Sequence, residues 1–306
     1  MAFRKCPKDN YQHTAGRLAV VTGATGGLGY EIALGLALGC TDIVLAARDE
    51  AKGRAAAGKI RSLAPRALVR FEKLDLANLA SITAFASRLA ALGRPLDLLV
   101  NNAGVMALPM RSITKDGFET QFGTNYLGHF ALTGKLLPLL RMSKWPRVVQ
   151  VSSLAHLCGK IRFDDLQGEL RYKPWAAYCQ SKLALLLFAR ELQRKSNTHG
   201  WGVLSSAVHP GLARTNLFEN GPGARSVLAL LSRFVNQPAA DGALPALFAA
   251  TSAAVEPGGF YGPRGLFGLA GPPAPARISK RAQDEDVAQR LWQMSEQLTG
   301  VRWAAA

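Results

Sequence analysis

Residues 18–29 read Leu-Ala-Val-Val-Thr-Gly-Ala-Thr-Gly-Gly-Leu-Gly, so an apolar run leads directly into a loop rich in glycine. The run at 18–21 is typical of a strand buried in a parallel sheet, and apolar residues at helical spacing follow the loop. A strand, a glycine loop and a helix in this order direct backbone N–H groups toward a phosphate. Glycine suits such a loop because a Cβ would keep the ligand away from the backbone. An ordinary glycine-rich turn is the alternative, and the flanking strand and helix favour the phosphate site.

The same alternation of strand and helix patterns continues along the chain. Short apolar runs predict further strands at residues 43–47, 68–74, 96–100, 147–151, 203–208 and 260–261. Helical patterns lie at residues 49–63, 79–92, 115–140 (with a break), 175–197, 239–253 and 284–299. This alternation predicts an α/β fold, a Rossmann-type doubly wound parallel sheet with helices on both faces.

We expect a single domain, because no change in composition marks a boundary along the chain. Residues 1–16 read as an N-terminal tail and residues 17–306 as the domain. Within the domain, the amphipathic stretch 212–236 has the glycines of a mobile substrate loop, and residues 263–306 form a C-terminal extension. The stretch 262–277 is rich in Pro and Gly and is predicted to be loop.

Composition narrows the class of protein. The four cysteines are widely spaced and form no CxxC pair, which argues against a disulfide framework and against a metal site. The N-terminus lacks the apolar core of a secretory signal, and no apolar run approaches the roughly 18 residues that span a bilayer. We therefore expect a soluble, cytoplasmic protein with no integral membrane segment, which leaves peripheral contact with a membrane open.

The formal net charge of +16 would suit an anionic partner. Its basic residues are dispersed, and no run resembles the basic arm of a nucleic-acid-binding protein. We interpret the charge as a solvated surface with a bias toward phosphates, and we expect no nucleic acid as partner.

A second informative stretch is Tyr178-Cys179-Gln180-Ser181-Lys182. On a helix, residues four apart lie on one face, so the Lys182 ammonium would lie near the Tyr178 phenol. A nearby positive charge favours the phenolate and lowers the pKa of a tyrosine, which could then exchange a proton near neutral pH. Taken alone, the pair is more often an ordinary surface lysine beside a half-buried tyrosine.

Arg48 follows the predicted strand at 43–47. In a dinucleotide-binding fold the end of this strand reaches the adenosine ribose, where a carboxylate would bind the 2′-hydroxyl of NAD. A guanidinium can instead form paired hydrogen bonds with a 2′-phosphate. Arg48 therefore favours NADP(H) over NAD(H), with a plain surface charge as the alternative.

Small and polar residues follow several other predicted strands. Asp75 and Leu76 follow the third, Asn101-Asn102-Ala103-Gly104 the fourth, and Ser152-Ser153 the fifth. His209-Pro210-Gly211 follows the sixth, with Thr215 a few residues on. Asn125 and His129 lie inside a helical pattern, where we expect His129 to be structural. The carboxyl ends of parallel strands are where open α/β sheets bind ligands.

Together these stretches resemble the short-chain dehydrogenase/reductase superfamily. The matching pieces are the glycine loop, Asp75, the 101–104 stretch, Asn125, the serine pair, the Tyr178–Lys182 pair and the 210–215 turn, in the expected order over residues 16–262. The arginine after strand two, the His-Pro-Gly turn and the long interval from Ser153 to Tyr178 resemble the retinol-dehydrogenase and protochlorophyllide-reductase-like branch.

The resemblance implies a catalytic set of Asn125, Ser153, Tyr178 and Lys182. Tyr178 would be the general acid or base, Lys182 would lower its pKa, and Ser153, rather than its neighbour Ser152, would bind the substrate oxygen. Asn125 would hold a water in a proton relay to Lys182. The cofactor would contact Gly23, Thr25, Gly27, Leu28, Gly29, Arg48, Asp75, Leu76, Asn101, Ala103, Gly104, Tyr178, Lys182, Pro210, Gly211 and Thr215.

The resulting hypothesis is hydride transfer between NADP(H) and a carbonyl or secondary alcohol of a small-molecule substrate. Residues 105–113, 154–175 and 212–236 would form a mostly apolar pocket. Reduction of a C=C bond with the same residues, and a non-catalytic NADP-binding regulator, are the alternatives. The glycine loop lacks the basic residue that many NADP-preferring members carry, so the cofactor preference depends on Arg48. Family habit suggests a homodimer or homotetramer.

Overall fold

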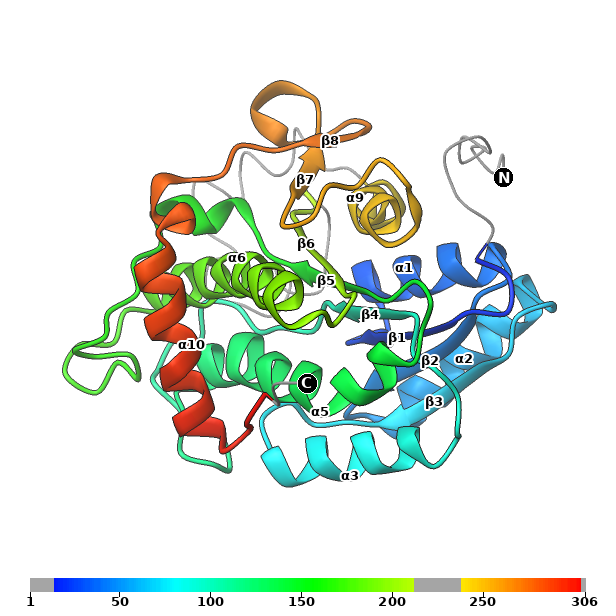
Figure 1. Ribbon diagram of the computed structural model, residues 1–306, viewed down its shortest axis with the longest axis horizontal. Helices are drawn as coiled ribbons and strands as arrows, with labels where there is room; N and C mark the ends of the chain where they lie inside the picture. Colours follow the sequence, from blue (N-terminus) through cyan, green and yellow to red (C-terminus); the bar gives the residue numbers. More distant parts are fainter. Residues whose placement is uncertain (1–13, 212–237, 304–306) are drawn as a thin grey trace.

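The computed structural model describes residues 14–211 and 238–303. Within these ranges one eight-stranded sheet runs through the molecule in the order β3-β2-β1-β4-β5-β6-β7-β8 (Figure 1). Strands β1 to β7 pair in parallel, and β8 pairs antiparallel to β7. The strands are β1 (Leu18–Thr22), β2 (Asp42–Ala47), β3 (Val69–Lys73), β4 (Leu98–Asn101), β5 (Arg147–Val151), β6 (Leu204–Val208), β7 (Phe260–Pro263) and β8 (Pro273–Pro275).

Helices cover both faces of this sheet (Figure 1). Helices α1, α2 and α9 share an apolar cluster on one face, and α3, α5 and α6 share another on the opposite face, where α10 packs on α6. Their bounds are α1 (Gly27–Leu38), α2 (Glu50–Leu63), α3 (Leu79–Ala90), α5 (Gly128–Arg141), α6 (Pro174–His199), α9 (Ala239–Thr251) and α10 (Glu285–Thr299). The predicted single α/β domain with a doubly wound sheet is therefore confirmed.

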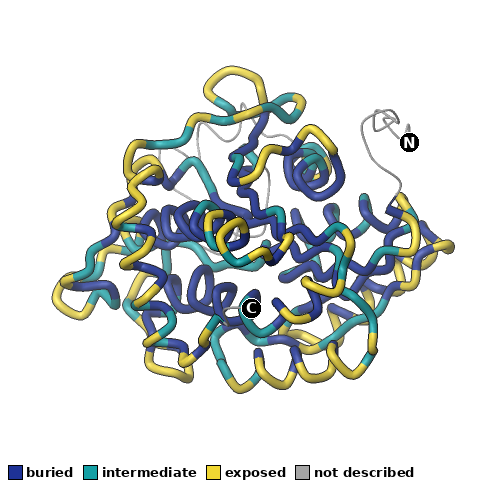
Figure 2. Tube along the Cα trace, viewed as in Figure 1, coloured by how far each residue is buried: buried dark blue, intermediate teal, exposed yellow. Residues whose placement is uncertain are grey.

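The central strands β1, β4 and β5 are buried at every position, and most of their residues are apolar, because helices cover both faces of the sheet (Figure 2). Successive side chains of a strand point to opposite faces. Along β1, Val20 joins the cluster on the α6 side and Val21 the cluster on the α1 side, and both have an exposed fraction of 0%. Helices on both sides of a strand thus explain the continuous apolar runs in the sequence.

Because the strands are parallel, their carboxyl ends meet at one edge of the sheet. The glycine loop follows β1, Arg48 follows β2, and residues 152–153 follow β5. The chain winds outward in opposite directions from β1 and β4, which are neighbours. Open α/β sheets bind ligands outside such a switch point, and every element of the candidate site adjoins this edge.

One prediction about the fold is wrong: residues 262–277 are not entirely loop. β7 extends to Pro263, and residues 273–275 form β8; Gly262 of β7 pairs with Ala274 of β8. Proline has no backbone N–H to donate, so it is tolerated in an edge strand, which needs hydrogen bonds on one side only. The prolines that suggested a loop therefore mark the edge of the sheet.

The N-terminal residues 1–13 and the whole of the predicted substrate loop at 212–236, including Thr215, lie outside the described residues. Within the described part of the chain, no helix is long and apolar enough to cross a bilayer.

Candidate active site

The glycine loop after β1 is packed so closely that side chains would not fit at two of its positions. Gly23 has φ of +67°, and a Cβ there would lie 2.8 Å from Cα of Ala103. A Cβ on Gly29 would lie 2.4 Å from the carbonyl oxygen of Gly23. Gly27 also has a positive φ, +53°, but a Cβ there would meet nothing within 4 Å. The loop therefore presents bare backbone at the N-terminus of α1, as a phosphate site requires; Thr25 is half-buried in it and Leu28 is buried beneath it.

Asn102 fixes the glycine loop against the end of β4, a role for which the sequence pattern had no signal beyond the amide itself. Its Nδ2 donates to the carbonyl oxygen of Thr22 (2.8 Å) and lies 3.5 Å from that of Gly23. The backbone N–H groups of Asn102 and Ala103 both donate to Oγ1 of Thr22, at 2.9 and 3.0 Å. These contacts join the glycine loop to the end of β4.

Asn101 is placed differently from expectation. Its side chain has an exposed fraction of 0%, and its Nδ2 donates to Oγ1 of Thr133 on α5 at 2.9 Å. The amide therefore faces the helix layer and not the open edge of the sheet where the adenosine was expected. The physical reason is that adjacent side chains at a strand end point to opposite sides, which leaves the outward position to Asn102.

The adenosine end of the candidate site is open to solvent. Arg48 is exposed, and within the described residues it forms no ion pair or side-chain hydrogen bond. Asp75 is half-buried, and its Oδ1 accepts from the N–H of Ala77 at 3.0 Å, while Leu76 is buried beside it. These residues leave one unpaired guanidinium and one partly accessible carboxylate at neighbouring strand ends.

Asn125 lies in a π-helical turn, Gly123–Leu127, between α4 (Thr120–Phe122) and α5. Its Nδ2 donates to the carbonyl oxygen of Val105 and to Oγ of Ser181, both at 2.9 Å, and its Oδ1 accepts from the N–H of Val105 at 2.8 Å. Such turns are rare and occur often at functional sites. The turn is the break expected within residues 115–140, and it fixes Asn125 against α6.

Gly104 is the point at which the Asn125 and Lys182 side chains converge. A Cβ on Gly104 would lie 3.1 Å from Oδ1 of Asn125 and 3.7 Å from Nζ of Lys182. The structure therefore brings three residues together that are far apart in the sequence, as the expected catalytic set requires.

His129 is a buried structural link, as expected. Its Nδ1 donates to the carbonyl oxygen of Asn125 at 2.8 Å, so its Nε2 accepts from Oγ1 of Thr22 at 2.9 Å. Burial lowers the pKa of His129 to about 3, which keeps the ring neutral at physiological pH. The ring ties the π-helical turn to the end of β1.

Tyr178 and Lys182 lie on α6 with the expected geometry, since Nζ of Lys182 is 5.7 Å from the centre of the Tyr178 ring. Nζ also donates to the carbonyl oxygen of Val151 at the end of β5 (2.9 Å). The expected lowering of the tyrosine pKa is absent, because burial raises the pKa of Tyr178 to about 12 although a hydrogen bond with Ser153 acts to lower it. Burial also lowers the pKa of Lys182 to about 8.

The two serines after β5 have different surroundings. Oγ of Ser152 donates to the carbonyl oxygen of Lys182 at 2.7 Å, deep in the core. Oγ of Ser153 accepts from the N–H of Ala155 at 3.2 Å, caps the short helix η2 (Leu154–Cys158), and hydrogen-bonds with Tyr178. Ser153 is thus the hydroxyl beside the phenol, and Ser152 anchors α6 to the sheet.

Apolar side chains surround the Tyr178 ring. Trp175 lies 5.4 Å from it between ring centres, with 35° between the planes. Ala155 and Cys179 form a small buried cluster with Tyr178, and Met106 packs against that cluster. The phenol is therefore approached past apolar surface from the 105–113 segment and from the first turn of α6.

Gln121 ties together two of the segments that were expected to form the pocket. Its Oε1 accepts from the N–H of Ala107 at 2.7 Å, and its Nε2 donates to Oη of Tyr172 (2.9 Å) and to the carbonyl oxygen of Pro174 (3.0 Å). Tyr172 in turn donates to the carbonyl oxygen of Leu108 at 2.8 Å. Ala107 has a positive φ of +48°, a conformation that this network helps to hold.

The turn after β6 closes the candidate site on the far side. Gly211 has φ of +69°, and its N–H donates to Nδ1 of His209 at 3.3 Å. A Cβ on Gly211 would lie 2.3 Å from the carbonyl oxygen of Leu269, so the turn is packed against the loop that joins β7 to β8. Pro210 and Gly211 are therefore at the sheet edge, as expected.

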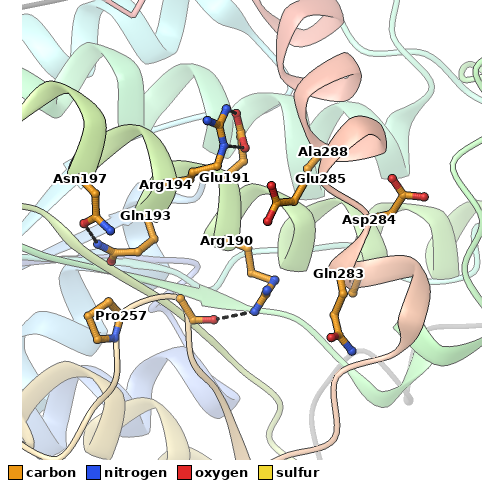
Figure 3. A pocket seen from close by; sticks show the side chains of 12 residues that line it. Arg190, Glu191, Gln193, Arg194, Asn197, Pro257, Gln283, Asp284, Glu285 and Ala288 are labelled. Atoms are coloured by element: carbon orange, nitrogen blue, oxygen red, sulfur yellow. Dashed lines mark hydrogen bonds and ion pairs between the residues drawn. The ribbon is translucent and has the colours of Figure 1, made fainter.

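A separate hollow of about 210 Å³ lies between the C-terminal half of α6, residues 257–258 and the start of α10 (Figure 3). It is lined by side chains of both charges, among them Arg190, Glu191 and Glu285. Arg190 follows Lys182 by eight residues, about 12 Å along the helix, so this hollow is distinct from the candidate site. Within residues 14–211 and 238–303, no three His, Cys, Asp or Glu side chains gather in a way that could hold a metal ion.

Known proteins share this arrangement. Residues 17–223 match the family described as short chain dehydrogenase. Human retinol dehydrogenase 12 is 42% identical to this chain over 290 residues, covering 94% of this chain and 88% of the human protein. The polyprenol dehydrogenase of Danio rerio is 40% identical over 293 residues, with the same shares covered.

Solved structures agree with these relatives. An uncharacterized protein from Mycobacterium paratuberculosis has a TM-score of 0.79 at 41% identity, covering 96% of this chain and 97% of that chain. A Pseudomonas aeruginosa RhlG–NADP complex has a TM-score of 0.65 at 26% identity, covering 82% and 96%.

Proposed function

Because the chain belongs to the short chain dehydrogenase family and is an oxidoreductase that acts on CH–OH or C=O groups, we propose that it reduces the carbonyl group of an apolar substrate with NADPH. In this reaction Tyr178 donates the proton. The observation that carries this proposal is the Tyr178 phenol, buried beside Ser153 and Lys182 at the sheet edge that also holds the glycine loop.

The charge state of Tyr178 favours reduction over oxidation. With a pKa of about 12, the phenol is protonated at neutral pH, as a proton donor must be. Ser153 lies next to the phenol, where its hydroxyl would donate to a substrate oxygen that gains negative charge. The bound nicotinamide would supply the hydride.

Lys182 and Asn125 position this proton donor. Lys182 is held by the carbonyl of Val151, and Asn125 is held by Val105 and Ser181, so both side chains are fixed before a substrate arrives. When Lys182 is protonated, its ammonium stabilises the negative charge that remains on Tyr178 after it has given up its proton. A fixed arrangement contributes to the rate because no groups need to be reorganised during the reaction.

The residues at the sheet edge fit a phosphorylated dinucleotide. The tight packing of Gly23 and Gly29 leaves backbone N–H groups without covering side chains, which suits a pyrophosphate. Arg48 lies one strand away as an exposed, unpaired guanidinium, which suits a 2′-phosphate and favours NADP(H) over NAD(H). The RhlG complex, a distant structural relative, contains NADP.

The apolar surroundings of Tyr178 favour an apolar substrate. Trp175 lies beside the Tyr178 ring, and Met106 packs against the small apolar cluster that contains it. The names of two relatives, retinol and polyprenol dehydrogenase, refer to apolar alcohols, which fits the same interpretation.

The test is a series of aldehydes and ketones of increasing alkyl length, incubated with NADPH and followed by the loss of NADPH absorbance. We expect kcat/KM to rise with chain length, by up to about fourfold for each CH₂ group that becomes buried. An enone in the series, with product analysis, separates reduction of C=O from reduction of C=C. Failure to oxidise NADPH with any of these compounds, although NADPH binds, would contradict the proposed activity.

A further inference from the structure

The loop that joins β7 to β8 ends in two adjacent apolar side chains that point into solvent. Leu266 and Phe267 each have an exposed fraction of 79%. Phe267 also has a positive φ of +54°, which is unfavourable for a bulky residue. A backbone that is strained in order to present an aromatic ring to water is a reason to look for a function.

The loop is a compact structure held by its own backbone. The N–H of Arg264 donates to the carbonyl oxygen of Pro272 at 2.8 Å, and that of Gly265 donates to the carbonyl oxygen of Ala270 at 2.9 Å. Two shorter turns at its tip add further backbone hydrogen bonds, from Gly268 to Gly265 and from Leu269 to Leu266. The backbone that carries the two apolar side chains is therefore held by several hydrogen bonds.

The chain carries positive charge and no negative charge in this loop and in the residues that follow it, up to residue 283. Residues 257–283 contain no Asp or Glu and four basic residues, Arg264, Arg277, Lys280 and Arg281. All four are exposed, and within the described residues none of them forms an ion pair. The loop thus joins an exposed apolar tip to an exposed arginine, Arg264, and three further exposed basic residues follow it in the chain.

We propose that the β7–β8 tip, defined as residues 264–272, is an interfacial contact that inserts Leu266 and Phe267 into an anionic phospholipid bilayer. Apolar side chains stabilise such a contact by leaving water, and each arginine or lysine near the surface adds attraction to the anionic headgroups. A second copy of the chain fits less well, because a symmetric contact through this tip would bring two acid-free cationic stretches together.

The tip adjoins the candidate active site. The carbonyl oxygen of Leu269 lies against Gly211, and Gly268 lies against the ring of His209, in the turn that follows β6. A bilayer held by the tip would therefore lie beside the rim of the site. For the apolar substrate class, which depends on the proposed function, this would shorten the route from the lipid phase to Tyr178.

The test is co-sedimentation of the whole protein with vesicles of phosphatidylcholine, with and without phosphatidylglycerol. We expect binding to the anionic vesicles that weakens with added salt. Replacing both tip side chains, L266S/F267S, should weaken vesicle binding by about tenfold or more, since each would lose the burial of an apolar side chain. Arg264→Gln should weaken it by about fivefold.

The matched control is L68S/L170S, which replaces two leucines with exposed fractions of 71% and 81% outside the tip. It should bind vesicles as the wild type does. Equal binding by L266S/F267S and the wild type, or no binding of the wild type to anionic vesicles at low salt, would overturn the proposal. A change from dimer to monomer in L266S/F267S without vesicles would instead identify the tip as a contact between copies. Turnover of a water-soluble aldehyde tests the proposed function separately.

Discussion

The two ends of the proposed cofactor site are built in opposite ways. At the nicotinamide end, Tyr178, Lys182 and Asn125 have exposed fractions of 7%, 5% and 0%, and each is held by neighbouring groups. At the adenosine end, Arg48 is exposed, and no other described side chain holds it. Both ends lie at the same edge of one sheet, so the contrast comes from the layers above it and not from the strands.

The contrast separates chemistry from cofactor choice. A buried group has a pKa that its surroundings set, and removing one member of its network leaves its partners unsatisfied. An exposed guanidinium contributes little to the free energy of unfolding, so it can be replaced without loss of structure. Substitutions at the first end should therefore change the rate, and substitutions at the second end should change which cofactor is used.

Tyr178→Phe should have the largest effect. It removes the phenol hydroxyl and keeps the ring between Trp175 and Cys179, so we expect kcat to fall by about a thousandfold, within the usual range for a lost general acid. NADPH binding, measured by titration calorimetry, should change little. Tyr261→Phe is the control, because that hydroxyl accepts from the N–H of Glu256 away from the site. Retained turnover in Tyr178→Phe would rule out the phenol as the proton donor.

Gly29→Ala tests the loop between the two ends. Its Cβ would lie 2.4 Å from the carbonyl oxygen of Gly23 and 2.5 Å from Nδ2 of Asn102. We expect a loss of about 1–3 kcal/mol in the free energy of unfolding, together with weaker NADPH binding. Gly58→Ala on α2 is the matched control, since a Cβ there meets nothing within 4 Å and should stabilise the helix by about 1 kcal/mol. Urea unfolding of both variants measures the difference, and a stable Gly29→Ala with normal NADPH affinity would contradict the close packing of the loop.

Arg48→Asp should change cofactor preference at the exposed end. The carboxylate would repel a 2′-phosphate and could accept from the 2′-hydroxyl of NADH. We expect KM for NADPH to rise by about tenfold while kcat at saturation is kept, because the lost attraction is that of one charged contact. Lys59→Asp makes the same charge change at an exposed position of α2. If the ratio of the two cofactors moves equally in both variants, the preference depends on net charge and not on Arg48.

The sequence predicted the fold and the edge of the sheet where the site lies, because these follow from local patterns. Apolar runs and helical spacing located the strands and helices, and the parallel arrangement brought the motif residues together. β8 was missed, because prolines are as typical of loops as they are of an edge strand. The clamp made by Gln121 was missed too, since it joins segments 14 and about 50 residues away.

Two features of the site depend on how deeply residues are buried, and the spacing of residues along the sequence does not determine this. Tyr178 and Lys182 are four positions apart, which sets their distance on a helix, but burial outweighs the nearby ammonium and raises the pKa of Tyr178 to about 12. The adjacent amides Asn101 and Asn102 are equivalent in the sequence. Only the layer of α5 above β4 determines that Asn101 faces Thr133 and that Asn102 faces the glycine loop.

His129→Gln should have the smallest effect of the four substitutions. It tests whether protonation of His129, beneath Asn125, makes the protein less stable in acid. Its pKa is about 3 in the folded protein and near 6.5 in the unfolded chain. Between these values the unfolded state binds more protons, so stability is complete above pH 6.5 and falls as the pH falls toward 3. For one site this amounts to about 1 kcal/mol near pH 5.5. Thermal unfolding of His129→Gln should therefore show a weaker dependence on pH than the wild type.

His199→Gln is the control for that comparison, because His199 is half-buried at the end of α6 and has no role in the network around Asn125. Its unfolding curve should follow that of the wild type across the acid range. His129→Gln should also be less stable at neutral pH, since the link between Thr22 and the π-helical turn is altered. A mutant with the same pH dependence as the wild type would show that other groups, such as the buried His209, whose pKa burial lowers to about 4, dominate acid unfolding. The loss of stability in acid would then come from His209 in the turn after β6 and not from His129 beneath Asn125.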